Sequence, residues 1–440
     1  MGELTVEAEW VAPEGVQGPE LQATWARLVL RVGDEVVSRL HDHRSGSVRD
    51  GLFLPLYPLA EWFASHWWFL RAEVEAPQKY GDLEFVPRHC IASAREGYAL
   101  PRLFISPVGS YTKLQWKRQR LPRQGVEFLA AGTAHVSTEG FVDAVSELIQ
   151  RVIARLEEHG LFGTLLQEEW RAVREAAPQE RDFCRAAAAL GEDPYDMTDE
   201  LAAALKGLAE RFPEELFEEF LLVASVDALD READDLQTVL TDACIQAPIL
   251  EPFREIREEG LGVPPGGDLP PWERGYRMAD KLRGRLGLQS DPLPRGSELA
   301  AKLGLASDAT LEDAVSSRPF RAASVDGIMV AGPDQAPRMV LHPRSEAAQR
   351  FHLFRGIGEY LGGTTPSSGL LSRANSERQK CNRAFAAEFL APAEGLRQRV
   401  ERHVLDGEDL EDLADTFGVS QYVIFHQVKN HGIAGVELGD

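Results

Sequence analysis

Residues 338–392 hold the strongest structural pattern in this chain of 440 residues. Met339 and Leu341 alternate as in a β-strand. Four large apolar residues then recur at spacings of three and four: Phe351, Phe354, Ile357 and Leu361. These patterns predict a strand followed by an amphipathic helix over residues 346–361. A second helix is predicted over residues 381–390, before a helix-breaking proline.

Three local motifs in this stretch resemble those of the ImmA/IrrE family of zinc metallopeptidases. Arg350-Phe351 precedes the position of a zinc-binding His-Glu-x-x-His motif, and Glu377 matches the third metal ligand. Cys381-Asn382 and the run from Phe385 to Pro392 match the helix that follows. The likeness covers about residues 298–434 and implies a C-terminal zincin-like α+β domain. Relatives control mobile elements and stress responses by cleaving repressors, so the resemblance also implies a regulatory role.

The metal-binding motif itself is replaced by Arg355-Gly356-Ile357-Gly358-Glu359. In the family, two His side chains one turn apart bind zinc, and the Glu between them is the general base. Arg355 stands at the first ligand, Gly356 at the base and Glu359 at the second ligand. A guanidinium cannot be deprotonated to bind metal, and at about 4 Å it would repel Zn²⁺ by roughly 8 kcal/mol at an effective dielectric near 20. The sequence therefore predicts a degenerate site without a catalytic residue and without zinc.

We expect the Arg355 guanidinium to take the place of the metal. Two carboxylates, Glu359 and Glu377, would otherwise face each other unpaired in a space of low dielectric constant. Arg355 lies at the i,i+4 spacing from Glu359, and its planar fork can bond to carboxylates in bidentate fashion. The prediction is a buried bridge from Arg355 to both carboxylates, and the alternative is an Arg355 exposed on the surface.

Other metal sites are alternatives to this prediction. His342 or His352 could join Glu359 and Glu377 in an altered zinc site, which would make the protein an active metalloendopeptidase that cleaves a regulator. His352 lies seven residues from Glu359, about 10.5 Å along a helix axis, which is far for one shared ion. The segment His41-Asp42-His43 also places two imidazoles on one side of an extended chain.

A basic segment over residues 111–123 makes nucleic acid an alternative partner, because interleaved cations and aromatic rings can grip single strands. The candidate contacts are Lys113, Trp116, Lys117, Arg118 and Arg120. Residues 409–432 resemble a helix-turn-helix, with Ser420 as the cap of the second helix. The formal net charge of −23 repels phosphates, so a protein partner is predicted in preference to nucleic acid.

The sequence divides into four predicted segments. They are a strand-rich α+β domain of unknown role at 1–143, an acidic helical region at 144–258, a Pro/Gly-rich linker at 259–296 and the ImmA/IrrE-like domain at 297–440. The aromatic segment 52–70 contains two prolines, a glutamate and a histidine. We therefore expect it to be a buried core helix rather than a membrane span or a docking surface.

The four cysteines lie far apart without a CxxC pair, which is typical of reduced thiols in the cytoplasm. The acidic first residues predict no signal peptide. Together with the degenerate motif, these features predict a cytoplasmic bacterial protein that binds another protein in a regulatory or scaffold role. A role in phage or mobile-element response is implied by analogy alone, and the oligomeric state is left open.

Overall fold

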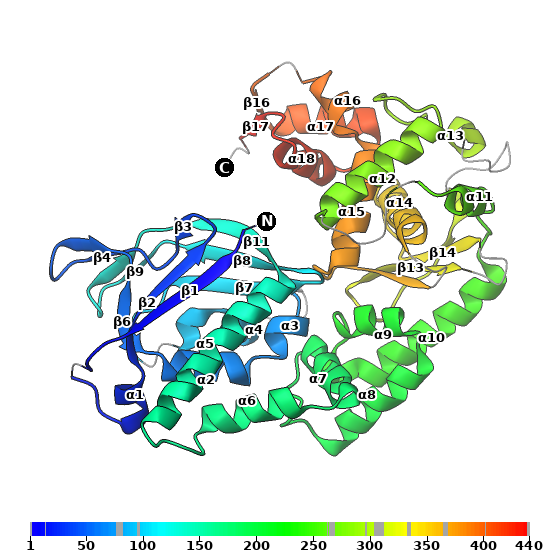
Figure 1. Ribbon diagram of the computed structural model, residues 1–440. Coiled ribbons are helices and arrows are strands. Elements are labelled where there is room, and N and C mark those ends of the chain that lie inside the picture. Colours follow the sequence, from blue (N-terminus) through cyan, green and yellow to red (C-terminus); the bar gives the residue numbers. More distant parts are fainter. Residues whose placement is uncertain are drawn as a thin grey trace. The chain divides into compact units, whose positions relative to one another are not determined.

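The computed structural model describes residues 2–13, 15–75, 82–94, 97–261, 263, 269–294, 297–302, 312–331, 336–363, 368–400 and 402–437. The chain forms two compact units, residues 1–206 and 207–440 (Figure 1). Helices and several small sheets occur together, which confirms the predicted α+β class. The boundary between the units falls within α8 (Asp199–Arg211), inside the region 144–258 that the sequence predicts as one helical segment.

The described strands of the first unit pair into three antiparallel sheets. One contains β1 (Leu4–Trp10), β2 (Trp25–Val32), β3 (Glu35–Val36) and β6 (Leu52–Pro55). The next has the order β5 (Ser47–Arg49), β4 (Leu40–Asp42), β10 (Val126–Phe128) and β9 (Gln119–Leu121). The third has the order β11 (Gly132–Ser137), β8 (Tyr111–Lys117) and β7 (Arg102–Val108).

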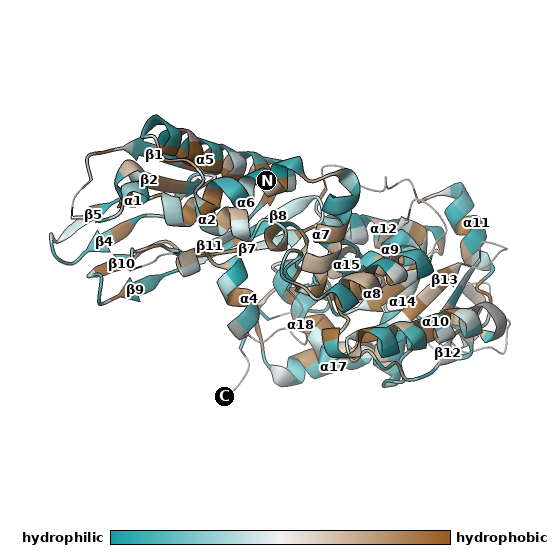
Figure 2. Ribbon diagram, turned by 90° about the horizontal axis from the view of Figure 1, so that it is seen from below, coloured by the Kyte–Doolittle hydropathy of each residue, from teal (hydrophilic) through white to brown (hydrophobic). Residues whose placement is uncertain are grey.

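A long amphipathic helix, α5 (Thr138–Glu158), packs against β1, β8 and β11. Figure 2 shows brown hydrophobic and teal hydrophilic residues along it, because only one face is buried. Ser137 caps its start by accepting a hydrogen bond from the Gly140 N–H at 3.0 Å. The other helices of this unit are α1 (Pro19–Ala23), α2 (Tyr57–Ser65), α3 (Phe69–Ala72), α4 (Asp82–His89), η1 (Ile91–Ala94), α6 (Leu165–Glu175) and α7 (Pro178–Leu190).

The aromatic segment 52–70 lies in the core of the first unit, as predicted, although it is not one helix. It runs from β6 through α2 to the start of α3. Trp62 and Phe69 are only 7% and 5% exposed, and the indole N–H of Trp62 donates to the Pro87 carbonyl at 3.0 Å. Among the described helices, none has the length and hydrophobicity of a transmembrane span.

The second unit is built on a four-stranded sheet with the order β12 (Ser316–Ser317), β14 (Pro337–Leu341), β13 (Val325–Ala331) and β15 (Gly369–Ser372). β13 and β14 are antiparallel, and β12 joins parallel to β14. The helices are α9 (Glu214–Leu221), η2 (Val226–Ala228), α10 (Leu229–Gln246), α11 (Pro252–Glu259), α12 (Pro271–Arg285), α13 (Ser297–Lys302), η3 (Glu312–Ala314), α14 (Glu346–Gly362), α15 (Glu377–Leu390), α16 (Ala393–Arg397), α17 (Gly407–Phe417) and α18 (Gln421–Asn430). β16 (Val404–Leu405) and β17 (Gly435–Val436) form a small parallel pair.

The segment 259–296, which the sequence predicts as a linker, contains a core helix of the second unit. Met278, Ala279 and Leu282 of α12 are at most 2% exposed, and α12 packs along α15. Gly275 permits this close approach, because a Cβ there would lie 2.4 Å from the Cys381 carbonyl oxygen. This part of the chain therefore contributes to the fold of the C-terminal unit.

Candidate functional site

The site is organised by α14, which contains the degenerate motif. The predicted helix 346–361 agrees with the observed span Glu346–Gly362. One side of α14 packs on β13, β14 and β15, while α11, α12 and α15 pack against it elsewhere. The helix is therefore buried on most sides and not only on one apolar face, and His352, Arg355 and Glu359 are all at most 9% exposed.

Arg355 is 2% exposed and bonded on both ends of its guanidinium. Its Nη1 donates to Asp326 Oδ2 on β13 at 3.0 Å. Its Nη2 donates to the Ser372 carbonyl oxygen and to Gln379 Oε1, each at 2.6 Å. Burial alone would raise the pKa of Asp326, but the neighbouring guanidinium of Arg355 holds that pKa below its ordinary value. Arg355 and Asp326 thus form a buried ion pair.

His352 belongs to the same cluster. Its Nδ1 lies 3.2 Å from Arg355 Nη1, and because a guanidinium only donates, this nitrogen accepts and carries no proton. Burial and the charge of Arg355 lower the pKa of His352 to about 4. The other candidate ligand, His342, accepts a hydrogen bond at Nδ1 from the Phe320 N–H at 3.3 Å and stacks on that ring.

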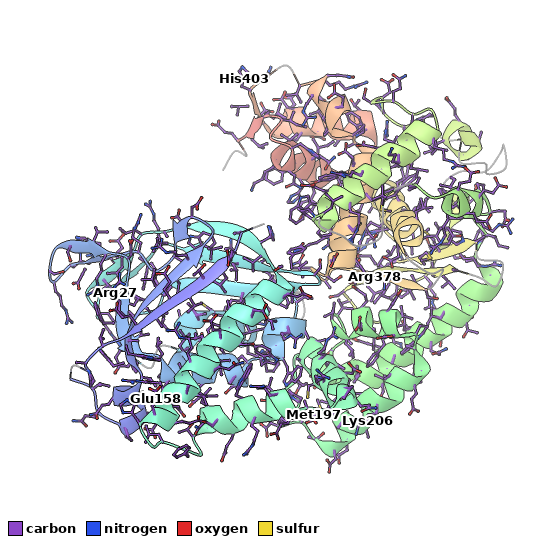
Figure 3. The ribbon with its side chains drawn as sticks, in the orientation of Figure 1. Arg27, Glu158, Met197, Lys206, Arg378 and His403 are labelled. Carbon is purple, nitrogen blue, oxygen red and sulfur yellow. The ribbon has the colours of Figure 1, made fainter. Side chains whose placement is uncertain are left out.

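Glu359 is held by α15 rather than by Arg355. Arg378 donates to Glu359 Oε1 and Asn382 donates to Oε2, and the Glu359 side chain is 4% exposed. Arg378, labelled in Figure 3, also pairs with Glu215 of α9 at 3.0 Å. Arg378 and Asn382 are one turn apart and therefore share the face of α15 that is turned to α14.

Glu377 points elsewhere. Its Oε1 accepts from Arg274 Nη1 of α12 at 3.2 Å. Successive residues of a helix are about 100° apart, so Glu377 and Arg378 cannot face the same space. The prediction that Arg355 bridges Glu359 and Glu377 is wrong, because its carboxylate partner is Asp326. The alternative of an exposed Arg355 is also wrong.

The buried hydrogen-bonded network around Arg355 contains three residues that the sequence analysis did not identify as site residues: Glu219, Asp326 and Gln379. Glu219 of α9 is 5% exposed; its Oε1 accepts from Ser376 Oγ at 2.6 Å and its Oε2 from Gln379 Nε2 at 3.0 Å. Burial raises the pKa of Glu219. Asp326 had a usable signal, since it interrupts the apolar run 325–330 of a buried strand. Glu219 had none, because it lies among acids that mostly face solvent.

Gly356 occupies the position of the general base, and Met339 of β14 fills the space that a side chain there would need. A Cβ on Gly356 would lie 2.6 Å from Met339 Sδ, so a carboxylate there would have to displace the core. Among the described residues, no group of three or more His, Cys, Asp or Glu side chains is placed to hold a metal ion. One cation, Arg355, stands at the position of the first metal ligand, and a second, Arg378, is bonded to Glu359 at the position of the second ligand. These residues do not fit a zinc ion, and they cross-link α9, β13, α14 and α15.

The predicted nucleic-acid contacts lie on two sheets of the first unit. Lys113 and Lys117 lie on the same, outer face of β8. Trp116 points inward, is 5% exposed and covers Gly132, so its ring is not available for stacking. Arg118 Nε donates to the Leu129 carbonyl at 2.8 Å, and Arg120 is exposed on β9.

The helix-turn-helix-like tail is formed by α17 and α18. Ser420 caps α18 as predicted, by accepting from the Val423 N–H at 3.4 Å. His41 and His43 stack edge to face, with ring centroids 4.5 Å apart. Asp42 between them pairs with Arg49 at 3.2 Å, so this segment is a salt-bridged hairpin.

A comparison with protein families places a known domain in the second unit. Residues 315–429 match the family model described as the IrrE N-terminal-like domain, a peptidase family. The match contains β13, β14, α14, α15 and the tail, and it confirms the resemblance seen in the sequence. No protein in a search of curated proteins matches the chain.

Proposed function

We propose that the IrrE-like domain of residues 315–429 is a degenerate metallopeptidase module that hydrolyses no peptide and works by binding another protein. Its setting in this proposal is the cytoplasm, in a regulatory or scaffold role. The observation that carries the proposal is the buried Arg355 guanidinium, bonded to Asp326, Ser372 and Gln379 at the position of the first metal ligand.

Physical chemistry supports the loss of metal chemistry. Zn²⁺ beside Arg355 and Arg378 would meet repulsion of several kcal/mol from each cation. Moving Arg355 away would leave Asp326 buried without its main partner. An active metalloendopeptidase would also need a third donor beside His352 and Glu359, and the described residues supply none.

Metal analysis of the purified full-length protein tests the loss of metal. We expect far less than one zinc per chain by inductively coupled plasma mass spectrometry. A matched variant with Arg355→His, Glu359→His and Arg378→Glu replaces both cations with ligand types and should gain zinc affinity if those cations exclude the metal. Stoichiometric zinc in the wild type, lost on Glu359→Ala, would overturn the proposal.

The binding role has its own test. The native complex, purified from its host through a tag on the full chain, should contain a defined protein at fixed stoichiometry by light scattering. Removing residues 315–429 should release that protein. A chain that elutes alone from its host would contradict the binding role.

A second candidate function, binding of single-stranded nucleic acid, is favoured by the outer face of β7 and β8. Arg102 lies directly opposite Lys117, and both cations lie within 6.0 Å of the Phe104 ring centroid. If this face binds oligo-dT, the change Lys113→Gln with Lys117→Gln should reduce the salt slope of log K by about 1.4. Lys206→Gln is the control, and an equal slope in all three proteins would refute this candidate.

A further inference from the structure

A cavity of about 830 Å³ lies within the second unit, between α12, α14, α15 and α18. It adjoins the buried ion pairs at two lining residues: His352, and Arg383, which bonds to the same Ser372 carbonyl oxygen as Arg355. Four aromatic side chains line it: Trp272, Tyr276, Phe351 and Tyr422. Its volume lies in the range of about 300–1,000 Å³ that is usual for small-molecule sites. The cavity is therefore large enough for a ligand and rich in flat rings.

Arg383 brings to this cavity a positive charge on which Glu219 and Asp326 act at longer range without bonding to it. Its hydrogen bonds go to neutral oxygens: the Ser372 and Ala374 carbonyls at 3.4 and 2.9 Å, and Asn375 Oδ1 at 3.4 Å. No carboxylate of the described residues forms an ion pair with it. Burial and the nearby Arg355 lower the pKa of Arg383 to about 10, so it stays charged at neutral pH. Arg383 is partly buried and makes no direct ion pair with a described residue, so an anion in the cavity would give it the charged partner that it lacks.

Glu388 lies behind the lining, 3.2 Å from His431 and bonded to Gln427, and the other histidines of the lining add little charge. Burial lowers the pKa of both His352 and His426, so these rings are mainly neutral at pH 7. Lys380 adds a second cation to the lining, one turn before Arg383 on α15. The acidic residue of the lining is Glu273, whose side chain is exposed. Arg383 and Lys380 therefore form a local cationic patch in the lining, in a chain of net charge −23.

We propose that this cavity binds a small anion that carries a flat aromatic ring, of the class of nucleoside monophosphates. The guanidinium of Arg383 matches the geometry of a phosphate, which it can bond in bidentate fashion. The aromatic side chains offer faces on which a base can stack. Tyr422 is 72% exposed and lies at the rim, where its ring can close over the ligand. This inference does not depend on whether the peptidase site is inactive.

Calorimetric titration of the full-length protein tests the proposal with AMP as the probe. Adenosine supplies the aromatic base without the phosphate, and inorganic phosphate supplies the anion without the base. Titrated separately, each should bind at least about tenfold more weakly than AMP. Arg383→Met should weaken AMP by about tenfold or more, as expected for the loss of a hydrogen bond to a charged group. Tyr422→Ala should weaken AMP and leave phosphate unchanged.

Controls keep the test decisive. Arg402→Met removes a cation that is 68% exposed and outside the cavity, and should leave AMP binding unchanged. If Arg383→Met does not fold, the exposed Tyr422→Ala and the partly buried Lys380→Met still test the site. Failure of AMP, GMP, CMP and UMP to bind would overturn the proposal. So would AMP affinity that is equal in the wild type, Arg383→Met and Tyr422→Ala.

Discussion

Replacing Arg355 with methionine should destabilise the second unit, because it breaks a buried ion pair. Asp326 is 4% exposed, and among the described residues it would keep ion pairs with Arg373 and Arg344, whose nitrogens lie 3.4 and 3.6 Å from its Oδ1. The acceptors on Ser372 and Gln379 would also lose their donor. Removing one partner of such a pair costs about 3–5 kcal/mol. For a unit of this size, that corresponds to a melting temperature lower by about 6–20 °C.

Differential scanning calorimetry measures this effect, and a double variant identifies its cause. Arg355→Met with Asp326→Leu removes both charges and replaces them with apolar side chains, so it should recover most of the lost stability. Neither zinc nor a chelator should change the melting of the wild type, since nothing that binds the native state is gained or lost. Equal melting temperatures for the wild type, Arg355→Met and the double variant would refute the reasoning.

Other perturbations test the remaining arguments. Gly356→Ala should cost about 1–3 kcal/mol by crowding Met339, whereas Gly284→Ala, where a Cβ meets nothing within 4 Å, should be neutral or stabilising in urea unfolding. Trp62→Ala should cost about 3–5 kcal/mol, and Phe162→Ala, 71% exposed, less than about 0.5 kcal/mol by the same measurement. Because the folded pKa of Asp326 is depressed, its contribution is complete above the ordinary Asp pKa and is lost as the pH falls through the folded pKa. The melting difference between wild type and Arg355→Met should therefore shrink in acid, and a difference that persists there would contradict this assignment.

The sequence determined the features that depend on local spacing and residue identity. Periodicity located α14 within a residue of its observed end and placed the second helix, though its start was four residues late. The identities of Arg355 and Gly356 predict a degenerate metal site, and the loss of metal stays a prediction. Ser420 as a helix cap is local in the same way, because a capping side chain bonds only three residues ahead.

The tertiary structure decided which charges meet. Asp326 reaches Arg355 across 29 residues of sequence because β13 lies beside α14. One 100° step along α15 turns Arg378 toward Glu359 and directs Glu377 to Arg274 instead. Likewise, α12 became part of the core and a wall of the cationic cavity only through its packing on α15. The period of a helix determines which residues within a few positions share a face. Contacts between different elements depend on how those elements pack and are oriented, which local sequence patterns do not encode.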